Sequence, residues 1–318
     1  MKTAWLICLG LLIPVLSTPS SESRVRGVMV LAFDDGYPSW IKTIAPELAA
    51  VNGVATGFVN NYRVRSGELR FEDLVVLQDK YRWEIGTHTY HHFNAPDFMK
   101  RHGIEKWFTE EVEASVKELE EWNLRVESLV FPYNAFSPEL AAKVARHFTS
   151  YRRRDVYPIA DGRRADGSVP AAGIDIAGYT PLDLMLKWID QAARNKQLLF
   201  LYGHNVLPDS EFFVGRVVSI DGPVLTSDQP ITLDPAKSDL YLVPDMTRRI
   251  FGTNFRVESV EGKTIKVSSA DLIRFTSVGS SFLIGPGYGT RLSDFRRLLS
   301  YASQKLEFKT VREAVGRH

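Results

Sequence analysis

The chain has 318 residues, which is long enough for one large domain or for a domain with an appendage. Hydrophobic residues make up 44% and charged residues 24% of the sequence, the composition of an ordinary globular protein. The formal net charge of +1 supplies no attraction for polyanions, so it argues against a nucleic acid or an anionic membrane surface as the partner.

The N-terminus carries an apolar run, AWLICLGLLIPVL at residues 4–16, between Lys2 and the small polar stretch STPSSES. The run is shorter than the roughly 20 residues that a membrane-spanning helix needs. We therefore expect a signal peptide over residues 1–17, a secreted or periplasmic protein, and no stable membrane span after cleavage; an uncleaved anchor is the alternative. The only cysteine, Cys8, lies in this run, so the mature chain would bind a metal through histidines and carboxylates.

Short apolar runs alternate with helical patterns from residue 27 to about residue 205. The patterns predict strands at residues 28–33, 54–60, 83–90, 126–134, 149–155, 173–179 and 197–206. They predict helices at residues 39–52, 71–81, 103–123, 137–148 and 181–195, with Ser137 as an N-cap and Pro138 in the first helical position. This alternation indicates parallel strands covered by helices, in an open sheet or a barrel.

The pattern changes after this segment. Residues 207–289 hold short apolar runs separated by Gly, Pro and Asp, and a hairpin is predicted at Glu261–Gly262. A helical pattern returns at residues 291–306, followed by a short strand at 307–311. We expect a first part of an α/β domain at 26–206, an all-β insertion at 207–289, and the last helix and strand of the domain at 290–318. The insertion could bind glycan, restrict access or mediate association, with Phe212, Phe213 and Tyr241 as sugar platforms or as core residues.

Unusual polar residues follow four of the predicted strands. Because the carboxyl ends of parallel strands meet at one rim, these side chains should gather there. The four groups are Asp34 and Asp35, then His88, His91 and His92, then Pro132, Tyr133 and Asn134, and finally His204.

The spacing of His88 and His92 predicts that both imidazoles lie on one side of a helical turn and hold one ion. Imidazole nitrogens suit zinc and its neighbours, and Asp35 would complete a three-ligand site with open positions. Asp34 would then be free to act as a general base on water activated by the ion, whose charge relieves the repulsion between the two carboxylates. The alternative is a polar loop with an Asp-capped turn.

His204 ends an apolar strand. An isolated histidine is most often a core residue with its hydrogen bonds satisfied. At this rim it would instead be the general acid that protonates the leaving group, opposite the base. The neighbours Gly203 and Asn205 favour a strand end and hence the acid.

These motifs resemble the polysaccharide deacetylases with NodB homology, carbohydrate esterase family 4. Residues 32–36, AFDDG, match the family's T-F-D-D-G motif except at the first position, and residues 88–92, HTYHH, match its second motif in the spacing of both histidines. The late strand ending in His matches residues 199–204. Order and separation agree over residues 27–205, and residues 290–315 resemble the family's closing helix and strand.

The resemblance implies a distorted (β/α)7 barrel, here interrupted near its C-terminus by the all-β insertion. It also implies metal-dependent removal of acetyl groups from an N-acetylglucosamine polymer, with one divalent ion, most simply Zn²⁺, and a glycan as the partner. Carried over by position, the residues are Asp34 as base, Asp35, His88 and His92 as metal ligands, Tyr133 through its backbone N–H as oxyanion donor, and His204 as acid.

The chain departs from the family at the third motif. Where the family often has R-x-P-x-G, residues 130–134 read VFPYN, so the Arg beside the base is absent and Asn134 replaces Gly. Loss of that cation predicts a raised pKa for Asp34. The next strand holds Arg152, Arg153 and Arg154; we expect Arg153 to substitute, the alternative being that all three are surface charges.

Other functions fit the same barrel. The enzyme alternatives are an O-acetyl esterase and an amidase for a substrate that is not a glycan. A third reading is a carbohydrate-binding protein that retains the metal site without turnover. The sequence does not decide among these substrates, nor the oligomeric state.

Overall fold

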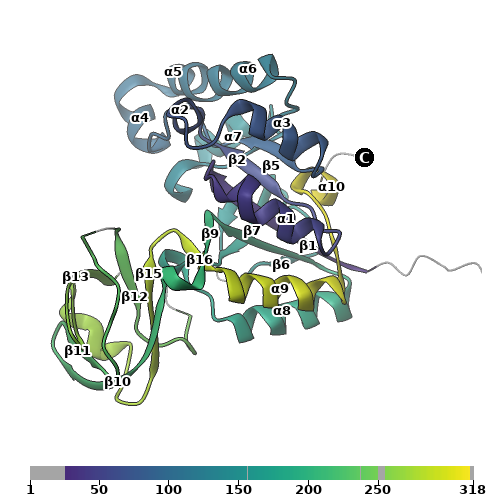
Figure 1. The fold of residues 1–318 in the computed structure, drawn as a ribbon. Coiled ribbons are helices and arrows are strands. Elements are labelled where there is room, and N and C mark those ends of the chain that lie inside the picture. The colour runs from purple at the N-terminus through teal and green to yellow at the C-terminus, as the bar shows by residue number, and fades with distance from the viewer. Residues whose placement is uncertain (1–25, 156, 237, 250–254, 316–318) are drawn as a thin grey trace, which may run out of the picture.

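The computed structural model describes residues 26–155, 157–236, 238–249 and 255–315, which form a barrel with outer helices and a second, smaller lobe (Figure 1). The predicted signal peptide at residues 1–17 lies outside the described residues. In the part of the chain that is described, none of the helices is long and apolar enough to cross a bilayer.

Seven parallel strands close into a barrel among the described residues, because β8 pairs in parallel with β1 as well as with β7. The barrel strands are β1 (Gly27–Asp35), β2 (Thr56–Val59), β3 (Glu84–Thr87), β4 (Ser128–Leu129), β5 (Ser150–Arg154), β7 (Ser168–Gly173) and β8 (Leu198–Gly203). Two short strands extend the sheet, β17 (Leu306–Phe308) beside β1 and β6 (Ile159–Ala160) beside β8. The predicted distorted (β/α)7 barrel with a separate β insertion is confirmed.

Side-chain alternation along β1 sets the direction of the first carboxylate. The even-numbered residues from Val28 to Ala32 pack with residues of the other barrel strands, whereas the odd-numbered residues from Met29 to Phe33 pack against the outer helices. Since successive side chains of a strand point to opposite faces, the next even-numbered residue, Asp34, points into the barrel.

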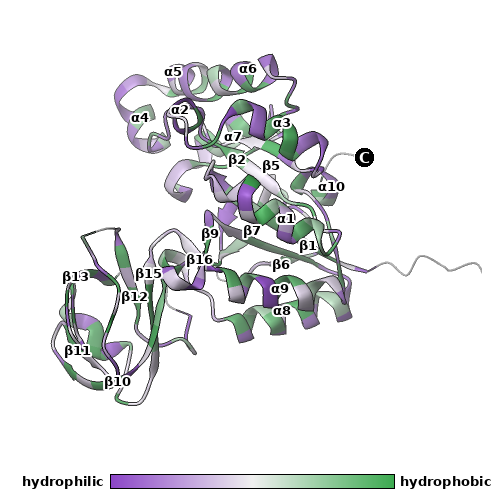
Figure 2. Ribbon diagram, in the orientation of Figure 1, coloured by the Kyte–Doolittle hydropathy of each residue, from purple (hydrophilic) through white to green (hydrophobic). Residues whose placement is uncertain are grey.

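Helices cover the outside of the barrel. They are α1 (Ala45–Ala49) with a preceding π-helical turn (Trp40–Ile44), α2 (Asn61–Arg65), α3 (Phe71–Asp79), α4 (Ala95–His102), α5 (Ile104–Trp107), a π-helical segment (Phe108–Glu113), α6 (Ala114–Glu121), α7 (Pro138–Val144), α8 (Leu182–Asn195), α9 (Leu292–Ser303) and α10 (Val311–Val315). On α8 the buried residues are Met185, Trp188, Ile189 and Ala192, the spacing of one helical face. Figure 2 shows α8 and α9 carrying both hydrophobic and hydrophilic residues, as expected of helices between a sheet and solvent.

Two predicted strands differ from the structure. The strand expected at 173–179 is wrong: β7 occupies Ser168–Gly173, and Ile176–Gly178 forms a 3₁₀ turn. The Ser, Pro, Ala and Gly residues of β7 have low strand propensity, but all six are buried, so packing on both faces overrides propensity. The strand expected at 126–134 is shortened to Ser128–Leu129 because Pro132–Asn134 turns away as a 3₁₀ helix. The N-cap at Ser137 is present, with its Oγ accepting from the Leu140 N–H at 3.2 Å.

The insertion forms a second closed barrel of antiparallel strands, the lower lobe in Figure 1. Its strands are β10 (Phe213–Asp221), β11 (Val224–Ser227), β12 (Leu240–Val243), β13 (Phe255–Glu261), β14 (Thr264–Val267) and β15 (Ser281–Pro286). The predicted hairpin joins β13 and β14, with Glu261 opposite Thr264 and Gly262 at a φ of 60°. Short 3₁₀ turns occur at Asp209–Glu211 and Ala270–Arg274.

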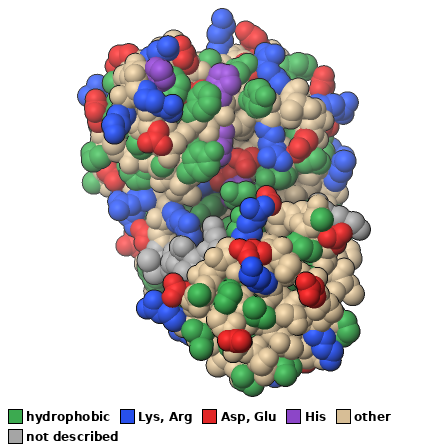
Figure 3. All heavy atoms as spheres, turned by 90° about the vertical axis from the view of Figure 1, so that its left-hand side faces the viewer, with side chains coloured by type: hydrophobic (Ala, Val, Ile, Leu, Met, Phe, Trp, Pro, Cys, Tyr) green, Lys and Arg blue, Asp and Glu red, His purple; other side chains and the backbone are tan. Residues whose placement is uncertain are grey.

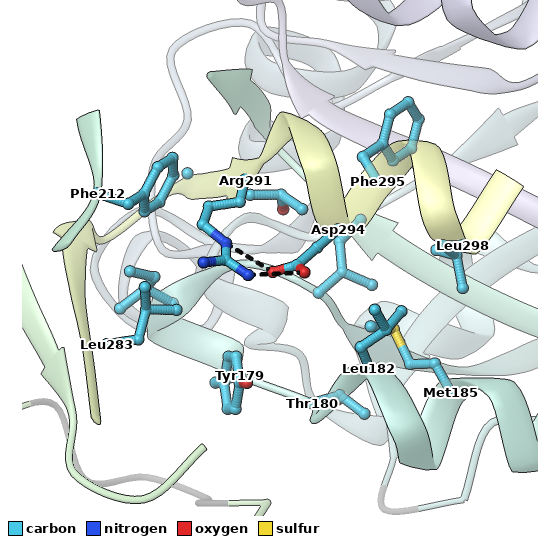
Figure 4. A pocket seen from close by; sticks show the side chains of 14 residues that line it. Tyr179, Thr180, Leu182, Met185, Phe212, Leu283, Arg291, Asp294, Phe295 and Leu298 are labelled. Carbon is cyan, nitrogen blue, oxygen red and sulfur yellow. Dashed lines mark hydrogen bonds and ion pairs between the residues drawn. The ribbon is translucent and has the colours of Figure 1, made fainter. Parts of the chain in front are cut away.

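Both ends of the insertion leave the first barrel side by side. The entry strand β9 (Asn205–Leu207) pairs in parallel with the return strand β16 (Gly289–Arg291). Behind this pair an apolar interface holds the two lobes together, and Figure 4 shows the Arg291–Asp294 ion pair inside it. Phe212 packs there against Gly285, where an added Cβ would lie 2.2 Å from the Phe212 ring. Phe212 and Phe213 are both buried, so they are core residues and not sugar platforms.

Candidate active site

An open cleft with a volume of about 340 Å³ lies at the carboxyl ends of the barrel strands. Figure 3 shows acidic and histidine side chains in a hollow between the upper barrel and the lower insertion. All four predicted polar groups contribute residues to this cleft, although His91 and Pro132 do not line it, and Tyr288 from the insertion's return segment lines it as well. The residues named at strand ends therefore do meet at one rim, as parallel strands require.

The rim is where the backbone departs most from ordinary geometry. Among the described residues other than glycine, nine have a positive φ, and five of them lie at this rim. Such conformations cost free energy for residues with a Cβ and persist where surrounding contacts impose them, often at functional sites. The five residues are Asp35 (76°), Thr89 (67°), His92 (64°), Tyr133 (59°) and Asn134 (53°).

Three side chains converge as a candidate metal site. The Nε2 atoms of His88 and His92 are 3.2 Å apart, and Oδ1 of Asp35 lies 3.5 Å from the first and 3.3 Å from the second. Ligand atoms held about 2.1 Å from a tetrahedral zinc ion lie about 3.4 Å from one another, so this spacing fits one ion. Oδ1 of Asp35 is buried and has no hydrogen-bond partner, which leaves a carboxylate oxygen available to a cation.

The loop that carries the histidines is not a helical turn, so that part of the prediction is wrong. β3 ends at Thr87, and positive φ values at Thr89 and His92 fold the chain back. The buried carboxylate of Glu111 fixes the loop by accepting from the His91 N–H at 3.0 Å and from its Nδ1 at 2.7 Å. These two hydrogen bonds to Glu111 turn His91 away from the imidazoles of His88 and His92.

Both candidate histidine ligands are neutral. Burial lowers the pKa of His88 and the pKa of His92 to about 4 in each case. Nδ1 of His88 donates to the carbonyl of Val130 at 2.8 Å, which leaves the lone pair on Nε2, the atom that faces Asp35. A neutral imidazole with its free nitrogen toward a carboxylate is the form that binds a divalent cation.

The carboxylate of Asp34 is paired with Arg152, not with Arg153. Two hydrogen bonds join them, Nη1 to Oδ1 at 2.7 Å and Nη2 to Oδ2 at 2.5 Å. The prediction of Arg153 is wrong because β5 alternates: Arg152 faces the interior with Ser150, whereas Arg153 is exposed. Nη2 of Arg152 also lies 3.5 Å from Oδ1 of Asn134, whose positive φ explains why Asn can stand where the family has Gly.

The pKa of Asp34 is lowered, which corrects the predicted increase. Burial alone would raise this pKa, but the charge and hydrogen bonds of Arg152 outweigh burial and lower it to about 2. The cation missing from the third motif is thus supplied from across the barrel. Asp34 is ionised at neutral pH and points to the same cleft as the histidines.

His204 is held by a second buried carboxylate. Its Nδ1 donates to Oδ2 of Asp175 at 2.6 Å, and Oδ1 of Asp175 accepts from Thr290 Oγ1 at 2.8 Å. Burial would lower the pKa of His204, but the hydrogen bond and charge of Asp175 raise it to about 9. The imidazolium therefore presents its Nε2 to the cleft, 3.9 Å from Oδ2 of Asp34. His204 is a cleft residue and not an apolar core residue.

Tyr133 lies beside the metal cluster, next to His92. It belongs to the 3₁₀ turn Pro132–Asn134, and its ring centroid lies 4.7 Å from that of His92. The carbonyl three residues earlier, that of Val130, accepts from Nδ1 of His88 at 2.8 Å, so the residues that lead into this turn contact the metal cluster. The side chain of Tyr133 is 63% exposed.

Two functional candidates were missed by the sequence reasoning. Asp175 follows β7, but the misplaced strand at 173–179 put it inside a strand instead of at a strand end. A correct end at Gly173 would have flagged it by the same rule that selected Asp34 and His204. Tyr288 lies in the insertion's return segment and reaches the cleft only through tertiary contacts.

Residues 22–149 match the family model described as polysaccharide deacetylase. The match covers the segment that carries Asp34, the Asp35, His88 and His92 cluster, and the turn of Tyr133, and it confirms the resemblance to the polysaccharide deacetylases. The barrel is therefore of the polysaccharide deacetylase type. None of the curated proteins matches this sequence.

Solved structures with a similar fold come from several bacteria. A family 4 carbohydrate esterase from Streptomyces lividans, in complex with acetate, is 14% identical, over 56% of this chain and 79% of that one, with a TM-score of 0.40. The peptidoglycan deacetylase PdaC from Bacillus subtilis is 19% identical, over 56% of this chain and 88% of that one, with a TM-score of 0.37. A CE4 family pseudoenzyme from Bacillus anthracis is 13% identical, over 56% and 55%, also at 0.37.

Proposed function

We propose that the protein is a metal-dependent deacetylase that hydrolyses acetamido groups of an N-acetylglucosamine-containing glycan. The observation that carries the proposal is the cluster of Asp35, His88 and His92, with an ionised carboxylate and a protonated imidazole beside it. Two nitrogen donors and one oxygen donor suit Zn²⁺ among the divalent ions. A divalent ion held there supplies Lewis acidity and lowers the pKa of water.

Asp34 is the base in this mechanism. Its carboxylate accepts a proton from the attacking water, and the paired Arg152 keeps it ionised and fixed in direction. The pKa of about 2 makes Asp34 a weak base by itself, so it acts only on a water already acidified in the site. Arg152 does not touch the substrate in this scheme; it is a positioning residue.

Residues on opposite sides of the cleft stabilise the oxyanion and protonate the leaving group. The backbone N–H of Tyr133 donates to the carbonyl oxygen as it gains negative charge. Nε2 of His204 then donates its proton to the departing nitrogen, while Asp175 keeps Nδ1 protonated and stabilises the imidazolium. An amine is a poor leaving group unless protonated, so the raised pKa of His204 favours an amide substrate over an acetate ester.

The N-terminal sequence bears on where the protein acts. The apolar run at residues 4–16 supports secretion to the periplasm or the exterior, where a polymeric glycan would be encountered. Mass analysis of the exported protein tests this point, because cleavage after residue 17 would remove the run, whereas an intact N-terminus on the membrane would contradict it.

Acetate release from an N-acetylglucosamine tetramer tests the function. The zinc-loaded protein should release acetate, and both the chelator-treated protein and the zinc-loaded Asp34→Asn variant should not. The O-acetyl esterase alternative is separated by acetylated xylan: if only this ester substrate releases acetate, the amide proposal is wrong. If neither substrate releases acetate while zinc binds, the deacetylase proposal itself fails.

A further inference from the structure

The insertion returns to the first barrel directly beside the proposed acid. After β15 the chain makes a short turn through Gly287 and Tyr288 and enters β16. Tyr288 lines the catalytic cleft, and its ring centroid lies 4.7 Å from that of His204 with the rings tilted by 49°. The insertion therefore contributes a side chain to the lining of the cleft.

This turn is held on several sides. The carbonyl of Gly287 accepts from the Ala177 N–H at 2.8 Å, and the carbonyl of Tyr288 accepts from the Asn205 N–H at 3.2 Å. Beneath the turn lies the ring of Tyr241, which an added Cβ on Gly287 would approach to 2.6 Å. Such support on rigid elements is what a side chain needs if it is to present one fixed face to a ligand.

The same segment reaches the acid through a second residue. Thr290, two positions after Tyr288, donates from Oγ1 to the buried Asp175 at 2.8 Å, and Asp175 in turn binds His204. The position of Tyr288 relative to His204 is thus fixed by a continuous set of hydrogen bonds between the two lobes.

The Tyr288 ring remains 53% exposed although one side contacts His204. A half-exposed aromatic ring in a cleft, with its polar hydroxyl at the edge, is suited to packing against the apolar face of a sugar ring. Tyr133 is the second exposed aromatic of the cleft, and it lies beside His92 on the metal side. The two tyrosines therefore flank the reaction centre from opposite lobes.

We propose that Tyr288 is the platform for the pyranose ring that carries the acetamido group, so that the insertion selects the glycan. The inference rests on the proposed function, because His204 protonates the nitrogen attached to that ring, and the ring must then lie next to His204. The acetyl group points away from Tyr288, toward the metal cluster and Tyr133. The substrate class is a glycan whose reacting unit is a pyranose with one apolar face.

Binding of the N-acetylglucosamine tetramer, measured by calorimetry on zinc-loaded protein, tests the platform. An Asp34→Asn parent is used so that no substrate is consumed, and the variants Tyr288→Ala, Tyr288→Phe and Tyr157→Ala are made in it. Tyr157 is the matched control, since it is 45% exposed and does not line the cleft. Melting temperatures should agree among all four proteins, because these side chains are largely at the surface.

Tyr288→Ala should weaken binding about five- to tenfold, the loss expected for one aromatic contact. Tyr288→Phe should retain most of the affinity, and Tyr157→Ala should bind within about twofold of the parent. If Tyr288→Ala binds as tightly as the parent while the wild type releases acetate, the platform is refuted and the deacetylase function stands. If binding depends on Tyr288 but the wild type releases no acetate, the platform holds and the reaction is wrong. A parent that does not bind the tetramer refutes the platform outright.

Discussion

Replacing Arg152 by Met should both destabilise the protein and change the ionisation of Asp34. The substitution keeps an unbranched, flexible side chain but removes the guanidinium group, and with it the charge and both hydrogen bonds to the carboxylate. Both partners are buried, with side-chain exposures of 3% and 2%. The carboxylate is then left in the barrel without a counter-charge, which is the costliest way to disrupt an ion pair.

The magnitude follows from the burial of the pair. Breaking a buried ion pair by removing one partner costs about 3–5 kcal/mol of the free energy of unfolding. Part of that cost is visible in the pKa of Asp34, which is lowered from 3.8 to about 2 and so represents roughly 2.5 kcal/mol of stabilisation of the ionised form. Because the folded pKa is the lower one, this contribution is present above pH 3.8 and is lost as the pH falls toward 2.

Urea unfolding of the metal-free protein at pH 7 and at pH 5 measures the effect. The exposed neighbour gives the control, since Arg153→Met should change the free energy of unfolding by no more than about 0.5 kcal/mol. Without the cation, burial dominates and raises the pKa of Asp34, so Arg152→Met should lose less free energy at pH 5 than at pH 7 relative to wild type. Equal effects of the two substitutions, or a loss below about 1 kcal/mol for Arg152→Met, would refute the assignment of the buried pair.

Three further outcomes are expected. His88→Ala should abolish zinc binding and acetate release, whereas His91→Ala should leave the zinc affinity within about tenfold of wild type, as for a group outside the ligand set. Calorimetry with zinc compares the two variants, and an equal loss of affinity would contradict the ligand assignment. Since the pKa of His204 is raised to about 9, the protonated acid is present below that pH and activity should fall as the pH rises through it. Asp175→Asn should move this basic limb of the pH–rate profile toward lower pH, and an unmoved limb would show that Asp175 does not set the pKa. Ser137→Ala should lower the free energy of unfolding by about 1 kcal/mol through loss of the N-cap, measured by urea unfolding, and a change below about 0.3 kcal/mol would contradict the cap.

Much of the active site could be predicted from the sequence because polar residues directly after an apolar run mark the end of a strand. The apolar run before Asp34, the run before His88 and the run before His204 are local patterns, and parallel strands bring their carboxyl ends to one rim. Local periodicities indicated parallel strands covered by helices and the separate β insertion, and the family resemblance implied the (β/α)7 barrel. Errors arose where a local pattern was weak, as in β7, whose Ser, Pro, Ala and Gly residues become a strand only by burial on both faces.

The sequence by itself determined the alternating strands and helices, the insertion and the residues at the strand ends, because these depend on periodicities within one segment. Only the tertiary structure decided that Arg152 pairs with Asp34, that Asp175 holds His204, and that Tyr288 enters the cleft. The first pair joins residues 118 apart in sequence, and Thr290 reaches Asp175 across 115 residues. Which of three consecutive arginines faces inward is set by the register of β5 in the closed barrel, and the position of Tyr288 is set by the pairing of β9 with β16. Both are properties of the packed sheet, and no short stretch of sequence specifies them.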